Sequence, residues 1–324
     1  MSRPAIPLPA LATYSGAGES RRSVPEVAFY FDIVCPYAYL ASQALPQLTQ
    51  QLGATIDYRP ILLGGVLKAL GSTPAAGSPS KLSHTRVDLA RWSAHLGVEL
   101  TYPSAHPRRT VEAMRLITAA HRLVRPVLIA ALYRAYWAQE KNIADPAVLY
   151  EIAESVGIER QDAERALRNA NVAAELRRNT DDAIAAGVFG VPTFVVDGGH
   201  GPRLFFGQDR LHFVKEVLAQ HPMAAAKEGE HTVAAPTLLT PTTVANEGRR
   251  VIFYYDLASP FAYLGATQIE RVAKRCGAVV DYRPILLGGL FRSLGTPMVP
   301  LHTYPEAKQR HTHEDLHRWA RYYD

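Results

Sequence analysis

Cys35 is the residue best placed for chemistry, because it lies where a run of apolar and aromatic residues gives way to Pro36 and a helical pattern. A cysteine at that point faces the unpaired N–H groups and the positive end of the helix. This position lowers the pKa of a thiol and favours a thiolate, either that of Cys35 or that of a bound ligand. The alternative is a small buried residue at a helix start.

The residue three positions after Cys35 limits that chemistry. Cys35-Pro36-Tyr37-Ala38 has the spacing of a redox Cys-x-x-Cys motif, but Ala38 stands in place of the second cysteine. An internal disulfide therefore cannot form there. The chain contains one other cysteine, Cys276, and so few cysteines indicate a reducing compartment, which predicts a cytoplasmic protein.

A second candidate is Val191-Pro192-Thr193, which follows Phe189-Gly190 and opens a strand. Proline is tolerated there because the sheet does not need its missing N–H. We predict a cis peptide bond before Pro192, which turns the backbone of Val191 toward an extended peptide ligand. A trans proline that simply starts an edge strand is the alternative.

The elements that position these residues follow from hydrophobic patterning. Residues 27–34 are typical of a buried strand, 36–52 of a helix and 54–59 of a second strand. From Lys81 to Gly187 the pattern is helical, with segments at 109–123, 126–141, 146–156, 161–169 and 172–186. Strands at 193–197 and 204–206 and a helix from Asp209 to Ala219 complete the order β-α-β, helical insert, β-β-α.

The chain contains an internal repeat. Residues 27–71 align without a gap with residues 251–295, and twenty-one of the 45 pairs are identical, including all of 57–65 against 281–289. Ser259 is the counterpart of Cys35, so this position accepts a hydroxyl, which suggests a hydrogen-bond donor or a helix cap as readily as a nucleophile. The second copy reaches only to Asp324 and is expected to be truncated.

These observations predict a domain organisation. Residues 1–23 are expected to be a flexible tail, 24–220 a first domain with a helical insert at about 81–187, 221–248 a linker, and 249–324 a truncated second copy. The linker is predicted from its mixture of Ala, Pro, Thr and Gly without periodicity.

Composition excludes several classes of partner. Hydrophobic residues make up 48% of the chain and charged residues 20%, as in an ordinary globular protein. The formal charge of +5 is spread along the chain without a basic stripe, so nucleic acid is not expected as a partner. No run approaches the length of about 18 apolar residues that a membrane helix needs, so we expect no membrane span.

Three motifs in order carry a resemblance to a known family. Phe29–Leu40, Gly187–Thr193 and Phe206–Leu211, arranged around the helical insert, resemble the 2-hydroxychromene-2-carboxylate isomerases and the kappa-class glutathione transferases. The resemblance covers 24–220 completely and 251–324 for half a domain. It implies an α/β fold: a DsbA-like thioredoxin fold with an all-helical insertion, followed by a partial tandem repeat.

The resemblance implies glutathione as the cofactor. Cys35 stands where the family usually has serine, next to the glutathione sulfur, and this departure leaves open whether the thiol donates a hydrogen bond or forms a mixed disulfide. Val191, before the expected cis-Pro192, would hold the cysteinyl backbone. Gln208 and Asp209 would hold the γ-glutamyl end, at a helix start that suits a carboxylate. Asp209 as a plain helix N-cap is the alternative.

Other family positions can be placed in the same way. Ser72 falls where the family commonly has asparagine, and Lys81 falls on a family lysine near the glycine end of glutathione. Lys81 could equally be a solvated lysine that opens a helix. Ser259 and Lys308 are the counterparts of Cys35 and Lys81 in the second copy.

For an isomerase, the resemblance implies that glutathione thiolate adds to the side chain of an opened chromene, which rotates and eliminates glutathione. The partners would be a small aromatic acid or another electrophile, and Arg108 and Arg109 are candidates to hold a substrate carboxylate. A kappa-like glutathione transferase or a monothiol disulfide oxidoreductase that uses Cys35 is the alternative. Kappa-class relatives are dimers, which suggests a homodimer.

A competing motif occurs near the end of the chain. His313-Glu314-Asp315-Leu316-His317 matches His-Glu-x-x-His, in which two histidines bind zinc and the glutamate is the base. The matching residues of the first copy, 86–90, offer no ligand at either histidine position. We therefore predict a solvated helix face and no metal, and keep a zinc hydrolase as a remote alternative.

Overall fold

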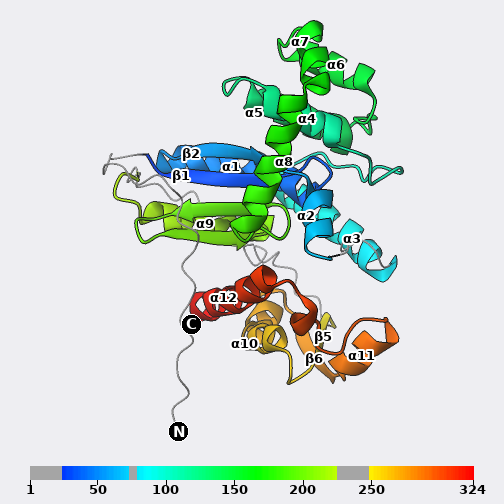
Figure 1. Ribbon diagram of the computed structural model, residues 1–324. Helices are drawn as coiled ribbons and strands as arrows, with labels where there is room; N and C mark the ends of the chain where they lie inside the picture. Colours follow the sequence, from blue (N-terminus) through cyan, green and yellow to red (C-terminus); the bar gives the residue numbers. More distant parts are fainter. Residues whose placement is uncertain (1–23, 73–78, 225–247) are drawn as a thin grey trace. The chain divides into compact units, whose positions relative to one another are not determined.

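The computed structural model describes residues 24–72, 79–224 and 248–324, and the chain divides into two compact units, Met1–Val233 and Ala234–Asp324 (Figure 1). The tail predicted at 1–23 and most of the linker predicted at 221–248 lie outside the described residues. Within the part of the chain that is described, no helix is both long and apolar enough to cross a membrane.

The first unit is built on a four-stranded sheet in the order β2-β1-β3-β4. Strand β1 (Glu26–Phe31) is parallel to β2 (Thr55–Pro60) and antiparallel to β3 (Thr193–Asp197), which pairs with β4 (Pro202–Phe206). The side chains of Val27, Phe29 and Phe31 in β1 are completely buried, which explains why this strand is an almost continuous apolar run.

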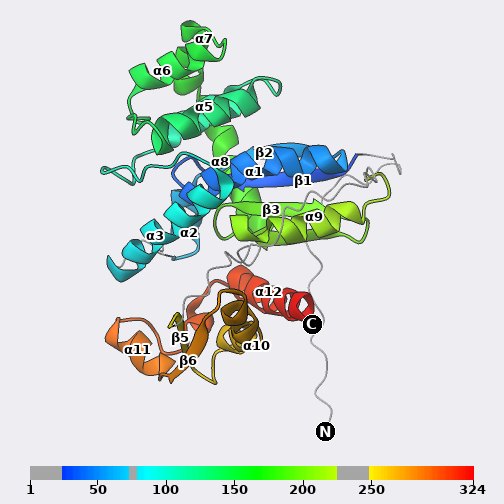
Figure 2. The ribbon, with the colours of Figure 1, turned by 180° about the vertical axis from the view of Figure 1, so that it is seen from behind.

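Helices cover both faces of this sheet. Helix α1 (Pro36–Leu52) and helix α9 (Leu211–Ala219) lie side by side on the face nearer the viewer in Figure 2, whereas α8 (Ala170–Ala185) crosses the opposite face. Helix α1 begins as predicted, with a proline at its first position, and ends at Gly53, whose φ of 64° is left-handed.

The helical insert joins β2 to β3. A short helix, α2 (Leu63–Ala69), precedes it, and patterning did not predict α2 because its two glycines lower helix propensity. The insert consists of α3 (Pro79–Leu96), α4 (Val111–Ala119), α5 (Arg125–Trp137), α6 (Pro146–Ser155), α7 (Arg160–Arg168) and α8. Trp137, Tyr133 and Tyr136 on α5 are the largest completely buried side chains among the described residues, so α5 is the core of the insert.

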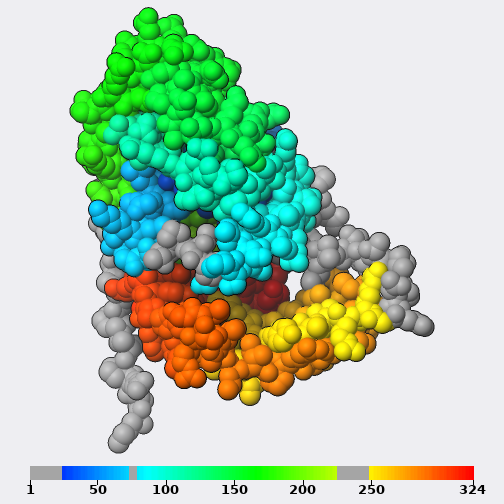
Figure 3. Space-filling view, turned by 90° about the vertical axis from the view of Figure 1, so that its right-hand side faces the viewer, coloured from blue at the N-terminus to red at the C-terminus, as the bar shows by residue number. Residues whose placement is uncertain are grey.

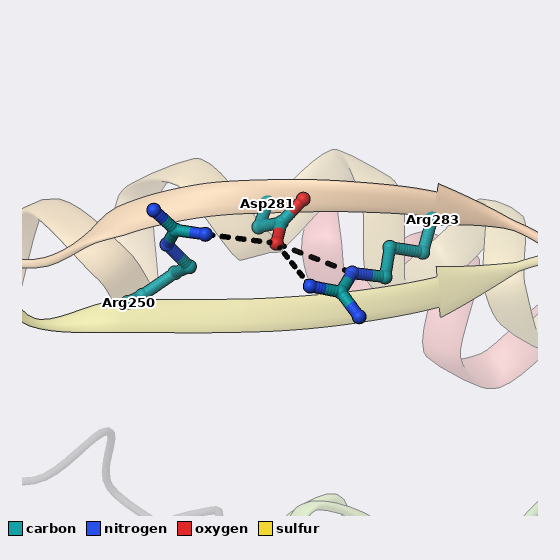
Figure 4. A network of polar contacts seen from close by, with 3 residues as sticks. All are labelled: Arg250, Asp281 and Arg283. Atoms are coloured by element: carbon teal, nitrogen blue, oxygen red, sulfur yellow. Dashed lines mark hydrogen bonds and ion pairs between the residues drawn. The ribbon is translucent and has the colours of Figure 1, made fainter.

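The second unit repeats the beginning of the first. Strand β5 (Arg250–Tyr255) is parallel to β6 (Val279–Pro284), in the same register as β1 and β2 shifted by the repeat offset. Its helices are α10 (Pro260–Arg275), α11 (Leu287–Ser293) and α12 (Glu306–Tyr323), with a 3-10 turn, η3 (Pro300–Thr303). Asp281 of β6 lies between Arg250 and Arg283, at 3.4 and 2.9 Å, and thereby bridges the two strands (Figure 4).

Many apolar side chains of the second unit are exposed. They include Ile252, Leu257, Tyr263, Leu286 and Leu290, which belong to the segment from β5 to α11 that is drawn in yellow to orange in Figure 3. Of their counterparts in the first unit, Ile33, Tyr39 and Val66 are buried. The two copies therefore share elements but differ in what covers them.

Candidate active site

The turn between β1 and α1 presents Cys35. The Cys35 N–H donates to the Asp32 carbonyl at 3.1 Å, and the Cys35 carbonyl accepts from the N–H groups of Ala38 and Tyr39, both at 3.1 Å. Cys35 has the extended backbone conformation usual at an N-cap, but its side chain makes no cap hydrogen bond to α1. The sequence pattern and the structure agree on this placement.

The thiol of Cys35 lies against the residue that precedes the predicted cis proline. Sγ donates a hydrogen bond to the Val191 carbonyl at 3.2 Å, and the Val191–Pro192 bond is cis, as predicted. The first paired residue of β3 is Thr193, so Val191 lies outside the sheet ladder. The structure thus brings Cys35 and Val191 together from positions 156 residues apart.

The expected lowering of the thiol pKa is wrong for this structure. Burial raises the pKa of Cys35 to about 12, because a thiolate there would lose its hydration. The N–H groups of Ala38 and Tyr37 lower the pKa, as a helix start should, but they do not overcome burial, and the charge of Asp32 raises it further. Cys35 is therefore a neutral thiol, not a thiolate.

Two polar residues, Gln208 and Asp209, follow β4 (Pro202–Phe206). The Gly207 N–H donates to the Pro192 carbonyl at 3.0 Å, and this bond fixes the start of a 3-10 turn, η2 (Gln208–Arg210). Gly207 has a φ of 105°, and a Cβ at this position would lie 2.6 Å from Asp209 Oδ1, so only glycine fits beneath this carboxylate. Asp209 lies inside the turn with Gly207 at its N-cap, so the alternative of Asp209 as the helix N-cap is wrong.

Gln208 is buried, whereas the Asp209 carboxylate is partly exposed and forms an ion pair with Arg210. Helix α1 contacts η2, and the charge of Asp209 contributes to a raised pKa of Tyr37 on the first turn of α1. Burial is the main cause of that raised pKa, followed by the hydrogen bond that Tyr37 donates to Asp88 Oδ2 at 2.8 Å. Tyr37 therefore lies between the cysteine turn and the Gln208-Asp209 turn.

The remaining predicted residues lie on other elements. Ser72 follows α2, with its N–H bonded to the Leu67 carbonyl at 2.8 Å, and Lys81 is an exposed residue in the first turn of α3. Ser259 and Lys308 belong to the second unit, where Ser259 Oγ accepts from the Ala262 N–H and Lys308 Nζ lies 3.7 Å from the centre of the Tyr304 ring. Their predicted roles stay predictions.

Arg108 and Arg109 differ in their surroundings. The Arg109 guanidinium is exposed and pairs with Glu112 at 2.8 Å, one turn further along α4. Arg108 is half-buried, and its backbone N–H donates to the Tyr136 hydroxyl at 3.1 Å. The loop that carries both arginines leads into Thr110, whose hydroxyl donates to Asp32 Oδ1 at 2.8 Å. The role of both arginines in binding a substrate carboxylate stays a prediction.

Two residues of α5 donate hydrogen bonds to backbone carbonyls of the cysteine turn. The Tyr133 hydroxyl donates to the Asp32 carbonyl at 3.3 Å, and Trp137 Nε1 donates to the Ile33 carbonyl at 2.8 Å. Sequence reasoning missed these residues and also Asp32. One signal could have found Asp32, because it is among the residues that the two copies share, with Asp256 as its counterpart.

The His-Glu-x-x-His motif lies on α12, where Glu314 pairs with Arg318 at 2.9 Å. Among the residues that the structure describes, no three histidine, cysteine, aspartate or glutamate side chains gather in a way that could hold a metal ion. The motif thus has no third ligand there, and the zinc alternative gains nothing from the geometry.

Comparison with known proteins matches both copies. A family model described as DSBA-like thioredoxin domain covers residues 26–219 and again residues 250–324. Together with the strand order, these matches confirm the predicted fold, including the partial second copy.

Individual relatives match the first unit over nearly their whole length. Glutathione S-transferase kappa 1 of Caenorhabditis elegans is 28% identical over 209 residues, which are 61% of this chain and 92% of that protein. A 2-hydroxychromene-2-carboxylate isomerase of Sphingobium xenophagum is 30% identical over 194 residues, 59% of this chain and 97% of that protein. A solved structure of selenomethionine 2-hydroxychromene-2-carboxylate isomerase superposes with a TM-score of 0.54 at 27% identity, covering 60% of this chain and 95% of that one.

Proposed function

Because the chain belongs to the DsbA-like thioredoxin family, we propose that its first unit is a glutathione-dependent enzyme that isomerises 2-hydroxychromene-2-carboxylate or a similar aromatic acid. One observation carries the proposal: a neutral, buried thiol at Cys35 lies within hydrogen-bond distance of the backbone beside cis-Pro192. A disulfide oxidoreductase needs a reactive thiolate, whereas an isomerase of this kind needs a donor beside the thiolate of its cofactor.

The polar groups of the site fit the parts of a γ-glutamyl tripeptide. The backbone of Val191, outside the sheet ladder, suits an extended cysteinyl unit. The carboxylate of Asp209 suits a terminal ammonium, for which Arg210 competes, and the amide of Gln208 suits a terminal carboxylate. Bound glutathione would supply the thiolate that adds to the conjugated side chain of the opened substrate and leaves after rotation, without net oxidation.

Cys35 would act by keeping its proton. Because its pKa is about 12, the thiol remains protonated at neutral pH and can donate to a neighbouring anionic sulfur in place of the Val191 carbonyl. Ala38, which is completely buried, leaves Cys35 without a second thiol three residues later, so the site favours repeated donation over disulfide exchange. The same donor would also serve a glutathione transferase, which makes conjugation of an electrophile the second reaction to assay.

The experiment combines glutathione binding by calorimetry with an isomerase assay on the full chain. We expect Cys35→Ser to keep activity within a few-fold, and Cys35→Ala to lose about 10-fold or more in kcat, because one hydrogen bond to an anion is lost. Ser259→Ala, the matched change in the second unit, should leave both measurements unchanged. Loss of turnover in Cys35→Ser, together with reduction of glutathione mixed disulfides by the wild type, would favour the oxidoreductase instead.

Variants at Asp209, Arg108 and Arg109 distinguish the binding of glutathione from the binding of the aromatic acid. We expect Asp209→Ala to weaken glutathione binding by about 10-fold, since a charge-assisted hydrogen bond is removed. Arg108→Ala should raise KM for the aromatic acid without changing the Kd for glutathione. Arg109→Ala is the matched control, because its guanidinium is exposed and paired with Glu112. No glutathione binding by the wild type would overturn the proposed function.

A further inference from the structure

Asp32 is a buried carboxylate to which three segments donate. Oδ1 accepts from the Val34 N–H at 3.1 Å and from the Thr110 hydroxyl at 2.8 Å, and Oδ2 accepts from the Leu63 N–H at 2.9 Å. These donors belong to the cysteine turn, to the start of α2 and to the segment that leads into α4. Its side chain therefore joins the turn that presents Cys35 to two separate parts of the unit.

The internal repeat shows which hydrogen bonds of Asp32 are common to both copies and which bond occurs in the first unit. Asp256, the counterpart of Asp32, accepts from the Ala258 N–H at 2.9 Å and from the Leu287 N–H at 2.7 Å. These two bonds correspond to the bonds from Val34 and Leu63, so holding the turn to the following helix is common to both copies. The bond from Thr110 is specific to the first unit, because it comes from the insert.

Thr110 departs from the usual behaviour of its position. It is the N-cap of α4, where a threonine oxygen ordinarily accepts from a backbone N–H of the first helical turn. Here Thr110 makes no such cap bond and donates to Asp32 instead. Thr110 thus leaves its cap bond unmade while it donates to a residue 78 positions away, and a departure from a local preference is expected at functional sites.

The charge of Asp32 reaches the groups around it. Burial raises the pKa of Asp32, while the bonds from Leu63, Thr110 and Val34 lower it, and none of the described cations contributes to that pKa. The charge in turn raises the pKa of Cys35 at the N-cap of α1 and those of Tyr133 and Tyr136 on α5, although burial is the larger cause in each. Asp32 thus opposes ionisation of the thiol as well as holding the turn.

We propose that Asp32 is a positioning residue that joins the Cys35 turn to the Thr110 segment of the insert, so that the thiol donor and the substrate side of the site keep one arrangement. The catalytic part of this inference rests on the proposed function. The effects of Asp32 on the pKa of the Cys35 thiol and on the backbone at the start of α4 do not rest on it, because they concern contacts within the first unit.

The test compares Asp32→Asn, Thr110→Val and Asp256→Asn in the full chain. The first readout is the pH dependence of Cys35 alkylation, resolved by peptide mass spectrometry. Asp32→Asn should shift the Cys35 profile to lower pH, because a nearby negative charge is removed, whereas Asp256→Asn should leave it unchanged. A residue that only held the turn would leave the profile of a folded variant unchanged as long as Cys35 stayed buried.

The second readout is amide hydrogen exchange at the start of α4. Asp32→Asn and Thr110→Val should each accelerate exchange there, and the double variant should show little more than either single change, because both break the same bond. In the isomerase assay both single variants should lose about 10-fold in kcat/KM. Thr110→Val keeps the test valid if Asp32→Asn does not fold.

Two results would overturn the inference. One is an unchanged Cys35 profile in folded Asp32→Asn, and the other is full additivity of Asp32→Asn and Thr110→Val in hydrogen exchange. If the wild type lacks glutathione-dependent activity while both physical readouts behave as expected, the proposed function fails and the positioning role of Asp32 stands.

Discussion

The turn at Asp32 and the turn at Asp256 have the same backbone bonds in different surroundings. In both, the carboxylate accepts from the N–H two residues later and from the start of the following short helix. Yet Ile33 is completely buried, whereas its counterpart Leu257 is 94% exposed. The first turn is covered by the insert and by β3, and no described residue of the second unit takes their place in the β5-β6 sheet.

The pKa values of the two carboxylates shift in opposite directions. Hydrogen bonds from Ala258 and Leu287 lower the pKa of Asp256, because they stabilise a charge that water also reaches. Burial reverses this balance at Asp32 and raises its pKa. A similar contrast holds for the side chains that follow, since Ser259 Oγ caps its helix while Cys35 Sγ donates to Val191. The local sequence sets the turn, and the covering elements set its chemistry.

The largest effect is expected from removing Trp137, a side chain of the insert that covers the cysteine turn. Trp137→Ala should destabilise the first unit by about 3–5 kcal/mol, because a completely buried side chain and its bond to the Ile33 carbonyl are lost. Hydrogen exchange read separately for each unit measures the change. The second unit, which has no such cover among its described residues, should be unaffected, and equal loss of protection in both units would contradict the comparison.

The next test changes the same residue in both copies. Tyr39 is 4% exposed, stacks on Tyr133 and donates to the Glu99 carbonyl, whereas its counterpart Tyr263 is 70% exposed. Tyr39→Ala should cost about 3 kcal/mol, and Tyr263→Ala should stay within about 0.5 kcal/mol. Denaturant unfolding followed by exchange in each unit distinguishes them. Similar costs would mean that the second unit is covered in solution.

A third test places a cysteine in the second turn. Ser259→Cys should react with iodoacetamide at pH 7 at least about 100-fold faster than Cys35, because only the thiolate reacts and burial suppresses it at Cys35. The rate at Cys35 should still rise between pH 9 and 11, since its pKa is about 12. Half-buried Cys276 serves as the reference within the same sample. Equal rates at 35 and 259 would show that the insert does not set the thiol pKa.

The smallest effect concerns helix capping. Ser259→Ala should destabilise the second unit by about 1 kcal/mol, because the bond from the Ala262 N–H to Ser259 Oγ is lost. Cys35→Ala removes no cap from α1, since Cys35 makes no such bond. Exchange rates in the first turns of α10 and α1 provide the comparison. A larger increase in exchange at α1 in Cys35→Ala than at α10 in Ser259→Ala would contradict this prediction.

Sequence reasoning succeeded where the determining contacts are short-range. Pro36 at the first position of α1, the strand at Thr193–Asp197 and the cis bond before Pro192 all follow from residues within a few positions. The repeat also identified equivalent elements, because 21 of the 45 aligned residue pairs are identical. The helix boundaries within the insert differ from the patterning by only a few residues.

It failed where distant segments decide the result. The helix start at Cys35 correctly predicts N–H groups that lower the thiol pKa, but burial of the thiol outweighs them. Nothing near Thr110 in the sequence indicates that its hydroxyl bonds to Asp32 instead of capping α4. Such contacts depend on the packing of the insert on the sheet, which periodicity does not describe.

Trp137 also has an optical consequence. It is completely buried against the Ile33 carbonyl, whereas Trp92 and Trp319, the other tryptophans of the chain, are half-buried. Its fluorescence should therefore be blue-shifted from theirs and sensitive to any movement of the cysteine turn. A phenylalanine at positions 92 and 319 would leave Trp137 as the single tryptophan, 104 residues away in sequence, but one hydrogen bond away, from the turn that presents Cys35.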